Sequence, residues 1–333
     1  VPVGLTRVFY SDNGSTAVEA ALKISYQYWQ NLGKGEKGSF IYFDNSYHGD
    51  TLGAVAVGGI DLFHRIYRRL LFKAYRLPLA LSRVEEFIKK RHSRIAAVII
   101  EPLIQAAGGM LLAPQGFLRG LRRICSHYRV LLIADEVAVG FGRTGTMFAC
   151  EQEAVRPDIL CLAKGLSGGY LPLAATLTTE KIYAAFLERG RDKARCRPPG
   201  PKTFFHGHSY TANPLACAAA LASLRIFRQQ RVLEKLPAKI GLFNRCLRRF
   251  SALPCVKQVR HKGLIAGIDL DGDDDIGVKV IKEARRRGAI LRPLGRVIVL
   301  MPPLSITNRE LKRLLDITYH SILYRSKDAG EGR

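Results

Sequence analysis

The chain has 333 residues, of which 47% are hydrophobic and 24% charged, values typical of a folded globular protein. This composition excludes disorder, a collagen-like repeat and a coiled coil as descriptions of the whole chain, and no apolar run reaches the length of a transmembrane helix. The net charge of +24 favours anionic partners, although net charge predicts how a protein associates and not which fold it adopts.

The start of the chain and its cysteines bear on processing and location. The sequence has no initiating methionine and no basic-then-apolar leader, and it runs almost directly into a predicted strand, so we expect an N-terminal segment to be missing. Its seven cysteines lack any C-x-x-C pair. That pattern argues against a disulfide framework and against a metal site, and it predicts a reducing, cytoplasmic location.

Short apolar runs alternate with helical stretches over the first 229 residues. The runs, rich in Ile, Val and Leu, are typical of strands buried on both faces and cover residues 40–43, 96–101, 130–134 and 159–163. The helical stretches cover residues 15–30, 82–91, 115–128 and 214–228. This alternation predicts an α/β fold with a mostly parallel sheet flanked by helices, in a large domain formed by residues 1–229.

The pattern changes in residues 230–333. A long basic helix is predicted at 232–250, with further helices at 278–287 and 307–324. Strands are predicted at 263–270, 290–292 and 297–301. We expect a smaller α+β domain here.

Two short motifs are poor matches to their usual context. Residues 140–145 fit G-x-G-x-x-G, but the preceding strand has already ended and no helix clearly follows, so a dinucleotide site is not favoured. Residues 165–169 fit G-x-S-x-G, but a strand and not a helix is predicted after the serine, which argues against a serine hydrolase.

A polar turn between a predicted strand and a predicted helix is suited to phosphate. It comprises residues 11–16, in which Gly14 allows close approach and Ser15 adds a hydroxyl. Thr16 and Glu19 have the spacing of a capping box. Many helices begin this way without a ligand, so this turn by itself is a weak signal.

Three further residues lie at or just after predicted strands. Asp135 ends an apolar strand, where a carboxylate needs a partner, which could be a protonated ring nitrogen, the cation of a salt bridge or the start of a helix. Lys164 ends the next strand beside glycines, where its amine could form a Schiff base with an aldehyde. Tyr47 follows the strand at 40–43 and could stack on a flat ring. An aldehyde, a ring nitrogen, a flat face and a phosphate together describe pyridoxal phosphate.

The run LLIADEVAVGFGRTGTMFACEQEAVRPDILCLAKGLSGG resembles the cofactor signature of class III aminotransferases, which have the type I fold of pyridoxal phosphate enzymes. The resemblance extends to the runs VFYSDNGSTAVEAALKISYQYWQ, NSYHGDTLGAVAVGG and FFHGHSYTANPLACAAALASL, and it favours the branch of the family that serves biotin synthesis. It covers nearly all of residues 1–324.

The resemblance implies a role for each matching residue. The cofactor would be bound covalently by Lys164, through its ring nitrogen by Asp135, through its phosphate by Gly14 and Ser15, and through its ring face by Tyr47. The run HGHSY would supply Gly207 on the substrate side and His208 on the cofactor side. Ser209 would reach the cofactor of a neighbouring subunit, so we expect a homodimer with shared sites. Arg292 would receive a substrate carboxylate, and Arg143 would lie near the substrate unless it forms a loop salt bridge.

Two departures from the family and three alternatives accompany this interpretation. The family's N-terminal segment is missing, and Val299 stands where the biotin branch has a tyrosine. The alternatives are another ω-aminotransferase acting on lysine, ornithine or a similar amine, a cofactor-binding protein without turnover, and a nucleic-acid binder suggested by charge alone. The sequence contains no known nucleic-acid-binding motif and no basic segment interspersed with aromatic residues that would support a nucleic-acid binder. We therefore expect no nucleic-acid partner and no membrane association.

Overall fold

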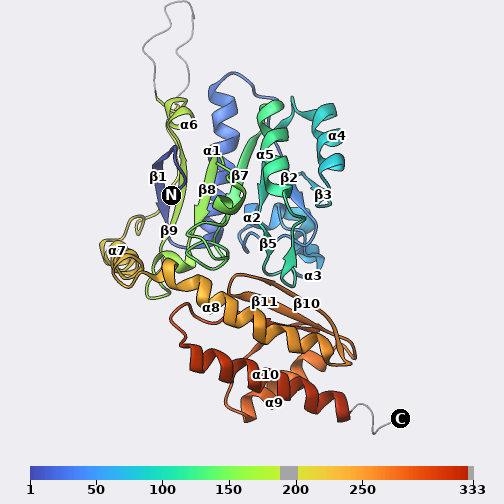
Figure 1. Cartoon of the computed structure of the whole chain (residues 1–333). Helices are drawn as coiled ribbons and strands as arrows, with labels where there is room; N and C mark the ends of the chain where they lie inside the picture. The colour runs from blue at the N-terminus through green and yellow to red at the C-terminus, as the bar shows by residue number, and fades with distance from the viewer. Residues whose placement is uncertain (188–201, 329–333) are drawn as a thin grey trace, which may run out of the picture. The chain divides into compact units, whose positions relative to one another are not determined.

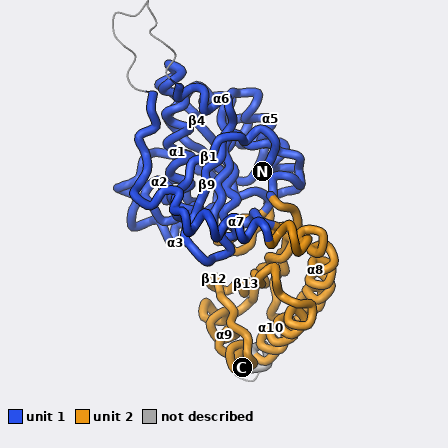
Figure 2. Tube along the Cα trace, turned by 90° about the vertical axis from the view of Figure 1, so that its left-hand side faces the viewer, with its two compact units in different colours: residues 1–103, 113–141, 148–225 blue, residues 104–112, 142–147, 226–333 orange. Residues whose placement is uncertain are grey.

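The computed structural model describes residues 1–187 and 202–328, which form two compact units (Figure 2). The large unit comprises residues 1–103, 113–141 and 148–225, and the small unit comprises residues 104–112, 142–147 and 226–333. Two short segments from the middle of the chain thus belong to the small unit. The division predicted from the sequence, with one boundary after residue 229, assigned both segments to the large domain. None of the helices in the described residues is long and apolar enough to cross a membrane.

The large unit is built on a seven-stranded sheet in the order β1-β9-β8-β7-β4-β2-β3. Its strands are β1 (Leu5–Ser11), β2 (Ser39–Phe43), β3 (Ala74–Leu77), β4 (Ile95–Ile100), β7 (Leu131–Asp135), β8 (Ile159–Leu162) and β9 (Ala174–Thr179). The pairs formed by β3, β2, β4, β7 and β8 are parallel, whereas β9 pairs antiparallel with both β8 and β1. The mostly parallel sheet expected from the sequence is therefore confirmed.

Helices surround this sheet (Figure 1). They are α1 (Gly14–Asn31), α2 (Leu52–Ala56), α3 (Asp61–His64), α4 (Leu81–Arg91), α5 (Phe117–His127), α6 (Glu180–Ala184) and α7 (Pro214–Gln229), with 3₁₀ turns η1 (Arg65–Leu70), η2 (Ala149–Glu153) and η3 (Lys164–Leu166). Helix α1 packs across β8 and β9, and its small residues Ala17 and Ala21 are fully buried. Because β4, β7 and β8 are buried on both faces, their sequences read as continuous apolar runs.

The small unit combines an antiparallel sheet with helices. The sheet has the order β10-β11-β13-β12, and β5 and β6 form a separate hairpin. The elements are β5 (Ile104–Gln105), β6 (Leu111–Leu112), α8 (Val232–Leu247), η4 (Arg248–Ala252), β10 (Val256–Lys262), β11 (Ile265–Leu270), α9 (Ile276–Arg286), β12 (Arg292–Leu294), β13 (Val297–Leu300) and α10 (Asn308–Asp328). The smaller α+β unit expected from the sequence is present.

Two predicted strands differ from the observed ones. The strand at 263–270 is the second arm of a hairpin, because Gly263 turns the chain with φ +59° and β10 precedes it. The strand predicted at 290–292 begins only at Arg292, since Ile290 is 83% exposed and lies outside the sheet. The first of these strands was predicted nearly correctly, but its partner β10 was missed because its residues are mostly polar. The second was predicted too early because Ile290 is apolar.

Candidate active site

Four neighbouring strands of the large unit carry polar residues where they end. In the order of the sheet, Lys164 follows β8, Asp135 ends β7, Glu101 follows β4 and Tyr47 follows β2. Parallel strands have their carboxyl ends at one edge, which is where open α/β sheets bind ligands. Asp135 pairs in register with Cys161, and Lys164 comes three residues after that cysteine. The sheet therefore brings the predicted aspartate and lysine to neighbouring strand ends.

Asp135 is buried and held by two donors. Its Oδ2 lies 2.6 Å from Nδ1 of His48, and its Oδ1 accepts the backbone N–H of Val137 at 3.0 Å. Because a carboxylate only accepts hydrogen bonds, Nδ1 of His48 carries the proton in this pair. Nε2 of the same ring is buried and has no partner within the described residues. This pairing orients the carboxylate.

Lys164 has a different environment. It adopts a left-handed backbone conformation with φ +45°, which is uncommon for a residue with a side chain. Its side chain is exposed and makes no hydrogen bond or ion pair within residues 1–187 and 202–328. The amine therefore stays open for reaction with a ligand.

Helix α1 presents two open N–H groups at its first turn. Asn13 is the N-cap: its Oδ1 accepts the N–H of Thr16 at 3.0 Å, and Thr16 Oγ1 accepts the N–H of Asn13 at 3.2 Å. The N–H groups of Gly14 and Ser15 have no acceptor within the described part of the chain. Two unsatisfied donors at the positive end of an 18-residue helix favour an anion.

The capping box predicted for Thr16 and Glu19 is wrong. Thr16 is instead the N3 partner of Asn13, and Glu19 Oε1 accepts the N–H of Gly53 at 2.7 Å. The helix begins one turn earlier than that spacing requires, because Asn13 is a better cap than Thr16.

Close packing brings this helix start to the end of β7. A Cβ on Gly14 would lie 2.6 Å from Cγ1 of Val137, so only glycine fits here without a shift. Ser15 Oγ accepts the N–H of Asp50 at 3.1 Å, and a Cβ on Gly49 would collide with that hydroxyl. Gly14, in the predicted phosphate turn, therefore contacts Val137. Val137 follows two residues after Asp135, the predicted partner of the ring nitrogen.

Tyr47 is fixed from both ends. Its N–H donates to Oε1 of Glu101 at 3.1 Å, and its hydroxyl donates to Oδ2 of Asp50 at 2.8 Å. Its ring lies parallel to that of His64, with centroids 6.4 Å apart and an interplanar angle of 9°. An aromatic ring held this way is a suitable platform for a flat ligand.

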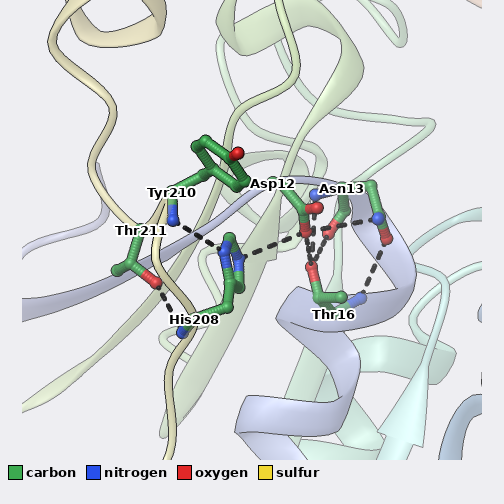
Figure 3. Close-up of polar contacts among 6 residues, drawn as sticks. All are labelled: Asp12, Asn13, Thr16, His208, Tyr210 and Thr211. Atoms are coloured by element: carbon green, nitrogen blue, oxygen red, sulfur yellow. Dashed lines mark hydrogen bonds and ion pairs between the residues drawn. The ribbon is translucent and has the colours of Figure 1, made fainter.

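The run that contains Gly207, His208 and Ser209 is exposed and near the start of α1 (Figure 3). Nε2 of His208 lies 3.7 Å from Oδ1 of Asp12, and Nδ1 accepts the N–H of Tyr210 at 3.2 Å. Ser209 is adjacent, exposed, and without a hydrogen bond in the described residues.

The two predicted substrate arginines belong to the small unit. Arg143 is largely buried and donates from Nη1 to the carbonyls of Leu264 at 3.0 Å and Pro302 at 2.6 Å, and burial lowers the pKa of its guanidinium to about 10. It makes no salt bridge within the described residues, so the salt-bridge alternative for this arginine is not observed. Arg292 begins β12, pairs in register with Val299 and is exposed.

Two residues of the site were not found from the sequence. His48 was visible only as part of the run YHGD, and no local signal tied it to Asp135, 87 residues away. Glu101 was placed inside a predicted strand, although a carboxylate directly after an apolar run is the same signal that singled out Asp135. A further buried carboxylate, Glu136, accepts the N–H groups of Ala149 and Cys150 at 2.6 and 2.8 Å. Burial raises the pKa of Glu136 to about 7, and its oxygens face backbone, not the site.

Comparison with known proteins agrees with this geometry. Residues 1–322 match the aminotransferase class-III family. The chain is 48% identical to the adenosylmethionine-8-amino-7-oxononanoate aminotransferase of Geobacter sulfurreducens, over 95% of the chain and 74% of that protein. It is also 48% identical to the enzyme of that name from Nitratidesulfovibrio vulgaris, over 99% of the chain and 65% of that protein.

Solved structures give the same result. The enzyme of that name from Methanocaldococcus jannaschii superposes with a TM-score of 0.91 at 42% identity, over 97% of this chain and 76% of that one. An amine transaminase from an uncultivated Pseudomonas species, solved in its PLP-bound form, superposes with a TM-score of 0.87 at 34% identity, over 96% of this chain and 77% of that one. The chain therefore belongs to the class III aminotransferases, enzymes of type I fold whose cofactor is pyridoxal phosphate.

Proposed function

We propose that this protein transfers an amino group from S-adenosylmethionine to 8-amino-7-oxononanoate, forming 7,8-diaminononanoate for biotin synthesis. The observation that carries the proposal is the placement of Asp135 and Lys164 at neighbouring parallel strand ends, in register through Cys161. The choice of substrates rests on the names of relatives that are 48% identical over nearly the whole chain.

The residues present fit pyridoxal phosphate. The two open N–H groups of Gly14 and Ser15 suit its phosphate, and the space that a Cβ on Gly14 would fill is already occupied by Val137. The carboxylate of Asp135, fixed by His48, suits a protonated ring nitrogen, and Tyr47 suits the ring face. When bound, the cofactor supplies an aldehyde and an electron-withdrawing ring that stabilises negative charge on a substrate carbon.

In this proposal the side chains of the protein hold the cofactor, bind the substrate and move protons. Nζ of Lys164 would hold the cofactor through its aldehyde, and the same amine would act as the base that moves a proton at the substrate carbon. Asp135 would keep the proton on the ring nitrogen, because a carboxylate beside that nitrogen stabilises its protonated, cationic form. Arg292 receives the carboxylate of the keto substrate, Arg143 binds substrate from its remaining donors, and Gly207 leaves room on the substrate side.

The proposal includes a homodimer in a cytoplasmic location. Ser209 is exposed in the single chain, which suits a residue that reaches the cofactor phosphate of a neighbouring subunit. All six cysteines in the described residues are unpaired, which suits a reducing compartment. Sedimentation equilibrium of the cofactor-loaded protein tests the dimer, and a monomer that turns over substrate would contradict the shared site.

The decisive experiment is spectroscopic. Protein loaded with pyridoxal phosphate should show the visible absorbance of lysine-bound cofactor, and borohydride reduction followed by peptide mass spectrometry should place the cofactor on Lys164. Lys164→Ala should lose both signals, whereas Lys89→Ala, at an exposed lysine of α4, should keep them. Cofactor found on another lysine would overturn the site assignment.

Turnover with a panel of donors separates the candidate activities. The proposal expects 7,8-diaminononanoate to form with S-adenosylmethionine, faster than with lysine or ornithine. Faster turnover with lysine or ornithine would assign the protein to another ω-aminotransferase activity. A protein that binds cofactor and turns over none of these donors would be a binding protein without turnover.

A further inference from the structure

A surface pocket of the small unit is lined mainly by cationic side chains. It has a volume of about 510 Å³ and is lined by residues at the end of α9 and on α10. Its charged and titratable side chains are those of Arg287, Arg309, Lys312, Arg313, Asp316 and His320. None of these residues belongs to the candidate active site, and the basic run 285–287 has no role in the proposed reaction.

The cations of α10 are clustered at an energetic cost. Arg309 lies three residues before Lys312 and four before Arg313, so their charges are neighbours on one helix face. All three are exposed, and none has an acidic partner within residues 1–187 and 202–328. Like charges at these spacings destabilise a helix, and a bound anion would offset that repulsion.

Two carboxylates near the pocket, those of Asp316 and Glu283, are each paired with a cation. Asp316 Oδ1 lies 2.6 Å from Nη2 of Arg249. Glu283 Oε1 accepts Nε of Arg287 at 2.8 Å, and this contact orients the guanidinium at the end of α9. Glu310, next to Arg309 on α10, accepts two hydrogen bonds from Thr307 at 2.8 Å and has no cationic partner in the described residues, so its charge offsets part of the positive field of the three α10 cations.

We propose that this pocket binds an oligophosphate anion, that is, two or more linked phosphates. The cationic groups extend over more than one helical turn, about 6 Å along α10 from Arg309 to Arg313, and continue to Arg287 on another element. Linked phosphates can contact groups on both elements at once, which suits this spread of cations better than a single phosphate does. The volume lies in the range of small-ligand sites, and the guanidinium groups match phosphate oxygens with paired donors. Because the groups are exposed, binding is salt-dependent.

The test compares two triple variants with the same loss of charge. Arg309→Gln/Lys312→Gln/Arg313→Gln removes the pocket cations, and Lys89→Gln/Arg94→Gln/Arg156→Gln removes two arginines and one lysine that are exposed and unpartnered in the described part of the large unit. Isothermal titration calorimetry with tripolyphosphate, at fixed ionic strength and on cofactor-loaded protein, measures affinity. Circular dichroism and cofactor absorbance show whether each variant is folded.

The pocket variant should lose affinity for tripolyphosphate by at least about tenfold, and the control variant by less than about twofold, since only the former removes groups that contact the ligand. Equal loss in both variants, or no binding to the unchanged protein, overturns the proposal. Tighter binding of a single-stranded oligonucleotide, lost in the pocket variant alone, overturns it in favour of a nucleic-acid surface. None of these readouts depends on turnover, so failure here is distinct from failure of the proposed function.

Discussion

The two edges of the large sheet each carry a lysine, and the two lysines are held in opposite ways. At the amino edge, Nζ of buried Lys37 donates to the carbonyls of His92, Ile95 and Arg129 at 2.6, 2.9 and 3.0 Å. At the carboxyl edge, Lys164 is exposed and unpartnered in the described residues. An ammonium group has three donors, so Lys37 has none left for a ligand and Lys164 has all of them.

This difference separates a structural cation from a reactive one. Lys37 joins the segments that precede β2, β4 and β7, and its stem lies against Trp29, with Nζ 4.4 Å from the ring centroid. The small unit repeats the contrast with arginines, since Arg143 is engaged by two carbonyls and Arg292 is exposed. Saturated donors indicate a role in stability, and open donors next to a strand end indicate a role in binding.

Asp135→Asn should give the largest change at the carboxyl edge. Asparagine can still accept the N–H of Val137, but it cannot hold a proton on a ring nitrogen, so kcat should fall by about 10²–10³-fold with the fold intact. Steady-state kinetics together with thermal unfolding checks this. A full-rate variant would show that Asp135 has no role beyond its hydrogen bonds to the protein.

Lys37→Met should have the largest effect at the amino edge, and on stability alone. Three buried carbonyls lose their donor, so the free energy of unfolding should fall by about 3 kcal/mol, as measured by urea denaturation. The cofactor absorbance and kcat of the folded fraction should not change. If the variant lost cofactor binding at temperatures where it is folded, Lys37 would have a role in the site and the prediction of an effect on stability alone would be wrong.

Lys37 should also make stability depend on pH. Burial, with a smaller contribution from nearby Lys34, lowers the pKa of Lys37 to about 8 from its usual 10.5. Between these pH values the unfolded chain binds more protons than the folded one, so the free energy of unfolding should rise with pH, by at most about 3 kcal/mol. Urea titrations from pH 7.5 to about 10.5 should show this rise in the unchanged protein and lose it in Lys37→Met.

Gly14→Ala should give an intermediate effect. The added Cβ lies 2.6 Å from Cγ1 of Val137, so the start of α1 must shift, at a cost of about 1–3 kcal/mol and with weaker cofactor binding. The double variant Gly14→Ala/Val137→Ala removes both methyl groups that collide and should recover most of the loss relative to Val137→Ala. Equilibrium titration with cofactor measures all four proteins, and failure of the rescue would mean that the contact does not position the helix.

Arg292→Ala should have the smallest effect on stability, and its effect on binding should be limited to one substrate. The exposed guanidinium has no partner to lose in the described residues, so stability should change by less than about 0.5 kcal/mol. KM for the keto carboxylate should rise by about ten- to a hundredfold, and KM for the amino donor should stay the same. Arg292→Lys keeps the charge but not the paired donors, so its KM for the keto carboxylate should lie between those of the unchanged protein and Arg292→Ala.

Much of the site could be predicted from the sequence because strand ends have a local signature. Asp135 and Lys164 each end an apolar run, and a parallel sheet must bring such ends to one edge. The polar turn at Gly14 was predicted for a similar reason, since small polar residues before an amphipathic stretch mark a helix start. The cap was misplaced because Asn13 and Thr16 are both good caps, and only the path of the chain chooses between them.

The partners of these residues lie too far away in sequence to be predicted. His48 meets Asp135 across 87 positions, Lys37 meets Arg129 across 92, and two short segments from the middle of the chain join the small unit. Residue type and periodicity determined which elements form and which side chains stand at their ends. Only the tertiary structure decided which donors are used up and which stay open, because a side chain at a strand end can be satisfied only by groups that folding brings beside it.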